Sequence, residues 1–194
     1  MRRREKLVIL VAVLAVCGAV AGSAAGRSAG RAAGSAAPVA GSADDKYLLK
    51  TASGIAFADF KGYEDWAVVS SARTDEVLKV IVGNPATINA YKSGVPLNGQ
   101  AFPDGSRIVK LQWKPKKSTE APFVVDVPDT FSQAFVMEKD SKRFPKSGGW
   151  GYALFNYDPK TDKFTADAAP ADCGNSCHVA VKAKDYIFHP YQKR

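Results

Sequence analysis

Residues that bind soft metals are scarce in this chain. Its 194 residues include three cysteines, two histidines and two methionines, one of which is the initiator. Outside the N-terminal apolar run, the thiol and imidazole ligands are Cys173, Cys177, His178 and His189. Zinc needs four ligands at the corners of a tetrahedron, and the neighbouring side chains of Cys177 and His178 diverge. The composition therefore argues against a zinc site.

The sequence also lacks an apolar run long enough to cross a membrane comfortably. Its longest run, Leu7 to Val20, has 14 residues, whereas a transmembrane helix needs about 20. The run follows a basic start and precedes the small residues Ala21 to Ala25, a pattern that predicts a cleaved signal peptide over residues 1–25. We therefore expect a periplasmic or secreted protein. Cys17 inside the run raises the alternative of a lipoprotein, which the bulky Val16 before it disfavours.

Residues 26–43 have few large side chains. They are mostly Ala, Gly and Ser, and such a segment cannot bury enough apolar surface to offset the entropy of ordering it. We expect a flexible linker here. The folded part is then one domain of residues 44–194, in which no internal repeat is visible.

Much of the excess positive charge belongs to the signal peptide. The full chain carries +8, but residues 1–25 hold four basic residues and one acidic residue, so the remainder carries +5. We find no nucleic-acid-binding signature. The densest basic cluster is Lys114, Lys116 and Lys117. It is either a docking patch for an acidic redox partner protein or an ordinary solvated loop.

The run Cys173-Gly174-Asn175-Ser176-Cys177-His178 is the most informative feature present. Two cysteines followed directly by a histidine form the arrangement that attaches c-type haem, in which each thiol adds to a vinyl group and the imidazole ligates the iron. Three residues separate these cysteines instead of the usual two, but a short helical turn can still rotate the first thiol into place. A disulfide between Cys173 and Cys177 is the alternative in an exported protein. We expect one haem c per chain, with His178 as its iron ligand.

Short β-branched and aromatic runs dominate the remaining sequence. Strands are expected at these runs, namely 66–70, 78–82, 107–113, 123–127, 134–138 and 151–156. Turn-forming residues separate them, for example at Pro128-Asp129. Helices are expected at 44–60, 85–92 and 177–183. The expected fold class is α+β and mainly β: an antiparallel sheet with a few packed helices, and the haem near the C-terminal Cys-Cys-His segment.

A second strong iron ligand is hard to find. A six-coordinate electron-transfer haem would need one, and the candidates are Met137 and His189. Met137 lies in an apolar run typical of a core, and we expect His189, which precedes Pro190 near the C-terminus, to be exposed. The sequence therefore favours a five-coordinate haem. Candidate distal side chains are Phe131, Phe135, Trp150, Tyr152 and Phe155, and candidate proton-transfer groups are Asp126, Glu138, Asp140 and Arg73. Each of these charged residues is equally typical of a solvated strand or loop.

The chain resembles the cytochrome P-460 family over nearly the whole folded part. Segment 177–188 carries the resemblance, because a short helix and an Asp-aromatic-apolar-Phe sequence follow the haem motif there. Three earlier stretches agree in order. These are Tyr63-Glu64-Asp65-Trp66, then Phe102-Pro103-Asp104-Gly105-Ser106-Arg107-Ile108-Val109-Lys110, then Lys139-Asp140-Ser141-Lys142-Arg143-Phe144 with Gly149-Trp150-Gly151-Tyr152.

The resemblance implies a periplasmic, mostly β, often homodimeric protein whose five-coordinate haem has His178 as axial ligand. In the cytochromes P-460 proper, a lysine bonds to a meso carbon of the porphyrin and the enzyme oxidises hydroxylamine, with nitric oxide chemistry on the way; that lysine falls on Lys110. The related cytochromes c′-β lack this bond and bind nitric oxide or handle gases. The resemblance thus implies hydroxylamine oxidation or nitrogen-oxide detoxification, with a non-catalytic carrier or sensor, or a degenerate member without haem, as alternatives.

Strand alternation is consistent with a special role for Lys110. Its side chain shares a face with Ile108 and Gln112, whereas Val109 and Leu111 point the other way. An amine on an apolar face is desolvated, which lowers its pKa and favours the neutral, nucleophilic form. An ordinary surface lysine is the alternative.

Overall fold

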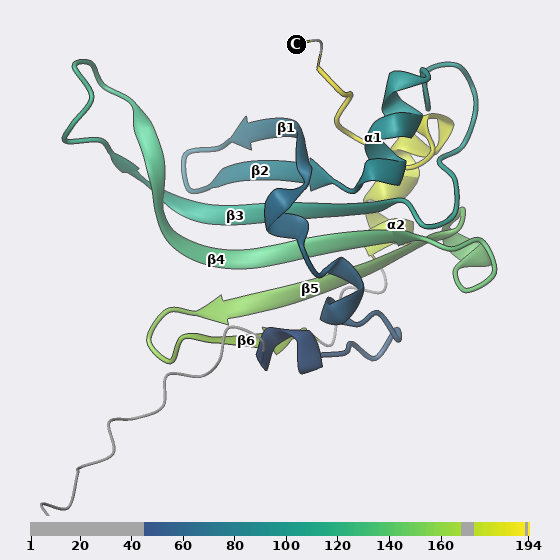
Figure 1. Cartoon of the computed structure of the whole chain (residues 1–194), viewed down its shortest axis with the longest axis horizontal. Coiled ribbons are helices and arrows are strands. Elements are labelled where there is room, and N and C mark those ends of the chain that lie inside the picture. The colour runs from purple at the N-terminus through teal and green to yellow at the C-terminus, as the bar shows by residue number, and fades with distance from the viewer. Residues whose placement is uncertain (1–44, 168–172, 193) are drawn as a thin grey trace, which may run out of the picture. The chain divides into compact units, whose positions relative to one another are not determined.

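Six antiparallel strands form one sheet in chain order (Figure 1). The computed structural model describes residues 45–167, 173–192 and 194, so the expected signal peptide and linker lie outside the described residues. The strands are β1 (Ala67–Arg73), β2 (Leu78–Gly83), β3 (Arg107–Lys117), β4 (Asp126–Lys139), β5 (Trp150–Asp158) and β6 (Lys163–Ala166). The expected class, α+β and mainly β with an antiparallel sheet, is confirmed; five expected strands correspond to β1 to β5, and β6 was not expected.

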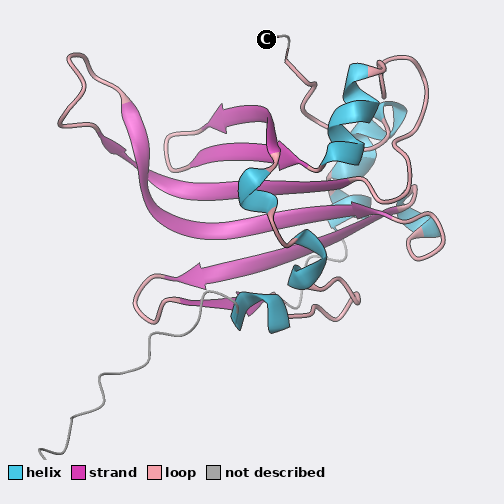
Figure 2. Ribbon diagram, viewed as in Figure 1, coloured by secondary structure: helices cyan, strands magenta, loops and turns pink. Residues whose placement is uncertain are grey.

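The helices are short, and both α-helices lie at one end of the sheet (Figure 2). The expected helix at 85–92 is confirmed, and it begins where it does because the Asn84 side chain accepts a hydrogen bond from the Thr87 amide at 3.0 Å. The helices are α1 (Pro85–Lys92) and α2 (Cys173–Ser176), with 3-10 helices η1 (Asp45–Leu48), η2 (Phe57–Phe60), η3 (Tyr63–Asp65), η4 (Pro145–Ser147) and η6 (His178–Lys184). Within the described ranges, every helix is too short or too polar to cross a lipid bilayer.

The single helix expected over 44–60 is wrong. Its described part forms η1 and η2, joined by a turn in which Gly54 has a φ of +84°. That left-handed conformation cannot continue a right-handed helix. The turn is closed by a hydrogen bond from the Thr51 amide to the Ile55 carbonyl at 2.9 Å, and it leaves Ile55 and Phe57 fully buried. Packing on the sheet therefore overrides the local helical preference.

The β3–β4 hairpin extends past the rest of the sheet, which corrects two further expectations. Of the strand expected at 123–127, only the last two residues are in a strand; Phe123 and Val124 lie in the hairpin loop and are 69% and 81% exposed. The turn expected at Pro128-Asp129 is also wrong, because β4 runs through it and Pro128 pairs with Pro115. Proline is tolerated here because β2 and β5 end before this point, so no third strand needs the missing amide.

The two faces of the sheet are covered by different segments. On one face, Phe57 and other residues of the N-terminal segment pack against Val109 and Phe155. On the other face, α1 and the C-terminal segment pack around Ile108. Lys110 shares this second face with Ile108, as strand alternation predicted, and both line the cavity described below.

Candidate functional site

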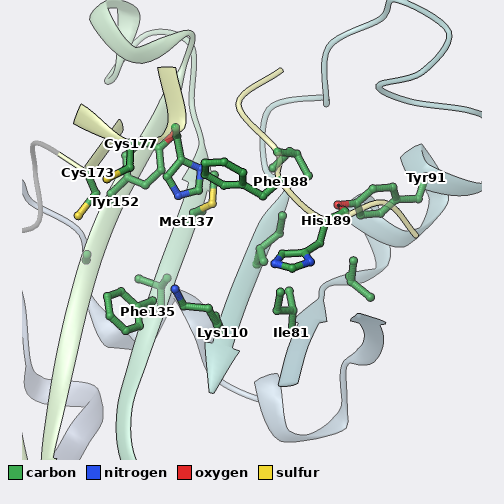
Figure 3. A pocket seen from close by; sticks show the side chains of 16 residues that line it. Ile81, Tyr91, Lys110, Phe135, Met137, Tyr152, Cys173, Cys177, Phe188 and His189 are labelled. Atoms are coloured by element: carbon green, nitrogen blue, oxygen red, sulfur yellow. Dashed lines mark hydrogen bonds between the residues drawn. The ribbon is translucent and has the colours of Figure 1, made fainter. Parts of the chain in front are cut away.

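The two cysteines of the Cys-Cys-His run lie on one helical turn. The Cys177 amide donates a hydrogen bond to the Cys173 carbonyl at 3.1 Å, which is the i to i−4 bond of an α-helix. Side chains four residues apart share one face of a helix, and both cysteines line one cavity (Figure 3). The three-residue spacing therefore brings the two thiols to the same side.

Gly174 lets this turn lie against β5. A Cβ at Gly174 would stand 2.3 Å from the Cε2 atom of Tyr152, much closer than real side chains approach. Tyr152 is itself buried and lines the cavity. A glycine at this position thus fixes how closely the cysteines approach the sheet.

His178 is oriented by a backbone carbonyl. Its Nδ1 lies 2.7 Å from the Tyr186 carbonyl oxygen, and because a carbonyl only accepts, Nδ1 carries the proton and Nε2 keeps a lone pair for a metal. The ring packs between Tyr152 and Phe188, each with its centroid 4.9 Å away. Burial lowers the pKa of His178; the Tyr186 hydrogen bond opposes this shift, and the charge of Lys110 adds to it. The imidazole is thereby kept in the neutral form that ligates iron.

A buried ion pair holds the turn that presents the Tyr186 carbonyl. Asp185 and Tyr186 both have left-handed backbones, with φ of +47° and +64°. The Asp185 carboxylate accepts hydrogen bonds from Lys139 Nζ at 2.7 and 2.9 Å and from the Phe102 amide at 2.8 Å. Lys139 is only 5% exposed. Sequence reasoning missed this support, although both charged residues lie in stretches that carried the family resemblance.

The cavity lies between the Cys-Cys-His segment and the sheet. Its volume is about 300 Å³, at the lower end of the roughly 300–1,000 Å³ typical of ligand sites. Much of its wall is apolar, with side chains that include Val69, Ile81, Phe135, Ile187 and Phe188. Such a wall suits a mostly apolar group.

Lys110 reaches this cavity from the centre of β3. Its Nζ lies 3.9 Å from the centroid of the Phe135 ring, and Figure 3 shows the amine on the cavity side of the sheet. Burial lowers the pKa of Lys110 and the nearby charge of Lys79 adds to the shift, while the two cysteines oppose it. The sequence prediction of a desolvated amine on this face is therefore supported by the geometry.

Tyr152, a residue of the cavity wall, has a buried hydroxyl that lacks a partner. Tyr152 Oη makes no hydrogen bond to any described residue, and burial raises the pKa of this phenol, so it stays protonated. A buried hydroxyl normally has a partner. Two thiols on one turn, an Nε2 on His178 that keeps its lone pair, and apolar walls together fit a covalently attached haem.

Only some of the aromatic residues expected at the distal position line the cavity. Phe135 and Tyr152 do so. Phe155 points to the opposite face, where strand alternation places it. Phe131 lines a second cavity, beyond the bulge in the β3–β4 pairing. Trp150 is fully buried in the core under α1 and the C-terminal segment. For these last three residues the expectation is wrong.

The charged residues named as candidate proton-transfer groups make other contacts in the described structure. Arg73 pairs with Asp126 at 2.7 Å, near the hairpin extension. Glu138 pairs with Arg107 at 2.9 Å. Asp140 accepts hydrogen bonds from the two amides at 142 and 143. These side chains are engaged in structural contacts and are not among the described residues that line the cavity. The structure therefore supports the alternative, in which they are ordinary strand or loop charges.

The two candidate second ligands both line the cavity. Met137 is partly buried against the core, as expected, and also contributes to the wall. His189 was expected to be exposed, and that is wrong. It is half-buried and lines the cavity, because the chain after Phe188 folds back against α1, where the Tyr91 hydroxyl donates a hydrogen bond to the His189 carbonyl at 3.1 Å.

The sequence matches a known family over most of the described chain. Residues 60–189 match the family model of Cytochrome P460, and a comparison with curated proteins gives no match. The matched range contains Lys110, both cysteines and His178, which together line the cavity. The chain therefore belongs to the cytochrome P460 family, whose members bind haem c.

Proposed function

We propose that the chain is a periplasmic c-type cytochrome with one five-coordinate haem, which oxidises hydroxylamine or detoxifies nitrogen oxides. The observation that carries this proposal is the convergence of Cys173, Cys177, His178 and Lys110 on one cavity. The two thiols would form the thioether bonds, and His178 Nε2 would ligate the iron. This agrees with the c-type haem chemistry of the family.

Haem bound there supplies an iron with an open coordination position and an acceptor for electrons from a small nitrogenous ligand. The chain's own residues control what reaches that position. Ile81, Phe135 and Phe188 make much of the wall apolar. Tyr152, which burial keeps protonated, is a poor iron ligand.

We propose Lys110 as the residue that bonds to the porphyrin edge. Support comes from its position facing the cavity and from its pKa, which burial lowers, so that more of the amine is neutral and nucleophilic. A covalent bond would distort the macrocycle and change its electronics, which is a means of tuning haem besides axial ligation.

A non-catalytic nitric oxide carrier or sensor is the second candidate. The observation that favours it is the apolar wall, whose described residues include none of the candidate carboxylates. Lys110 and His189, whose polar side chains also line the cavity, favour catalysis instead. A degenerate protein with a Cys173–Cys177 disulfide and no haem is the third candidate.

The test is to mature the protein in a haem-attaching host and to measure its intact mass under denaturing conditions. Haem that stays on the chain under denaturing conditions supports covalent attachment. Its absence from the double variant Cys173→Ser and Cys177→Ser locates the bonds. A haem-free mass with the two cysteines joined identifies the degenerate form. A high-spin spectrum with hydroxylamine oxidation supports the enzyme, whereas nitric oxide binding without turnover supports the carrier.

We also propose that the protein is a homodimer that passes electrons to a redox partner protein. The loop of the β3–β4 hairpin exposes Phe123 and Val124, and this apolar tip is a surface that a second copy would cover. The basic cluster is weak support for partner docking. Two of its three lysines, Lys116 and Lys117, form ion pairs within the hairpin at 3.1 and 2.9 Å.

A further inference from the structure

His189 is held in the cavity by its neighbours in the C-terminal segment. It precedes Pro190, which restricts its backbone to extended conformations. The buried Tyr91 of α1 donates a hydrogen bond to the His189 carbonyl and stacks on Tyr191 with centroids 5.6 Å apart. In Figure 3 the imidazole projects into the cavity between Tyr91 and Lys110, away from the two cysteines. The fold therefore fixes the segment and leaves the ring at the cavity surface.

The two histidines of the cavity differ in what their rings contact. His178 has Nδ1 committed to a carbonyl, the support that an iron-ligating histidine nearly always has. Neither ring nitrogen of His189 is hydrogen-bonded to a described residue; its only hydrogen bond there is through its carbonyl. His189 therefore has both nitrogens available to a small molecule, and it lacks the second contact that orients an iron ligand.

The surroundings of His189 favour its neutral form. Burial lowers its pKa, and in the haem-free chain the positive charges of Lys110 and then Lys79 lower it further. The titratable groups around it are Lys110 on β3, Lys79 on β2 and Tyr91 on α1, with Cys173, Cys177, His178 and Tyr152 lining the same cavity. A neutral imidazole accepts a proton at neutral pH.

We propose that His189 is the catalytic proton acceptor for a hydroxylamine-class substrate held in this cavity. The inference rests on the function proposed above. Oxidation of hydroxylamine to nitric oxide releases protons and electrons in equal number; the electrons leave to the external redox partner, and each proton passes from a substrate N–H or O–H to the unprotonated ring nitrogen of His189. The half-exposed imidazolium then returns the proton to water.

The first measurement is an NMR titration of the haem-free protein, which needs no turnover. With two histidines in the sequence, the variant His178→Ala assigns the remaining signal to His189. We expect its pKa below the ordinary value of about 6.5, and we expect Lys110→Met to raise it, because a positive neighbour is removed. A pKa above the ordinary value, or one that Lys110→Met leaves unchanged, contradicts the proposed environment.

The second measurement compares His189→Gln with the wild-type haem protein. Glutamine keeps a polar side chain but cannot take up a proton, so kcat/KM for hydroxylamine should fall by about 100-fold or more, while nitric oxide binding and the high-spin spectrum persist. The plot of kcat/KM against pH should fall less steeply on its acid side, because protonation of the substrate is then the only titration that reduces the rate there. Gln192→Ala, an exposed residue on the same segment, should behave as wild type.

The outcomes separate this inference from the function on which it rests. A wild-type protein that does not oxidise hydroxylamine overturns the proposed function, and the acceptor role falls with it. A wild-type protein that oxidises hydroxylamine, with an unchanged rate and pH profile in His189→Gln, overturns the role of His189 alone. A low-spin wild-type spectrum that becomes high-spin in His189→Gln identifies an iron ligand, which also overturns the acceptor role.

Discussion

At the scale of single residues, Lys110 separates the two functions that the site supports. If its amine is bonded to the porphyrin, Lys110→Leu should move the Soret band towards that of an ordinary c-type haem. The variant should also lose hydroxylamine oxidation and keep nitric oxide binding, because the bond alters the electronics of the macrocycle without supplying the iron ligand. Absorption spectra and turnover assays of the matured protein measure both effects.

Lys79→Met is the matched control for that prediction. Lys79 contributes a positive charge next to Lys110 but does not line the cavity, so its removal should leave the Soret band in place. If Lys110→Leu also leaves spectrum and activity unchanged, then Lys110 is only a strand residue and the cytochrome c′-β-like function is the better one.

Gly174 sets the distance between the cysteine turn and the sheet. In Gly174→Ala the new methyl group would meet Tyr152 at 2.3 Å, so the turn must move away from β5. We expect destabilisation by about 1–3 kcal/mol, as for other overpacked sites, and a smaller fraction of chains with haem attached. Urea unfolding and intact mass measure these effects. If the clash is the cause, a double-mutant cycle with Tyr152→Leu will show coupling between the two positions; independent effects would contradict it.

At the scale of elements, the turn after η6 depends on one buried ion pair. Asp185→Asn would leave the amine of Lys139 buried without its counter-charge, which costs about 3–5 kcal/mol when one partner of a buried pair is removed. The Tyr186 carbonyl would then lose its fixed position, and with it the orientation of His178. Urea unfolding and the spectrum of the haem protein measure the two effects.

Asp129→Asn is the control for the buried pair. Asp129 pairs with Lys116 at 3.1 Å, but both side chains are well exposed, so little change in stability is expected. Equal effects of the two substitutions would mean that the Asp185 pair is not what holds the turn.

Elements that depend only on residues close together in the sequence were predicted well. Helix α1 has its own cap and first-turn proline, and strand alternation alone put Lys110 on the same face as Ile108. The predictions of a helix at 44–60 and of a turn at Pro128 were wrong because they depend on the assembled sheet. The first was overridden by burial of Ile55, and the second by the extension of β4 past the ends of β2 and β5. His189 was misplaced for the same reason, since its position depends on Tyr91, far away in the sequence.

At the scale of the whole molecule, the two faces of the sheet have different roles: one is a packed core and the other carries the candidate site. One face is sealed by the N-terminal segment around Phe57, and the other carries the cavity and the Cys-Cys-His segment. The β3–β4 hairpin continues beyond the ends of β2 and β5 as a two-stranded arm (Figure 1). An arm with an apolar tip is free to contact another molecule without disturbing the cavity.

We expect this arm to hold the proposed homodimer together. Phe123→Ser with Val124→Ser should convert the protein to a monomer, because two apolar side chains that are 69% and 81% exposed would no longer gain from burial. Light scattering coupled to size-exclusion chromatography measures the mass, and the haem spectrum should not change. Leu97→Ser alters a residue that is 77% exposed elsewhere in the chain and should leave the dimer intact. A dimer that survives the double substitution places the contact elsewhere, and a monomeric wild type contradicts the homodimer itself.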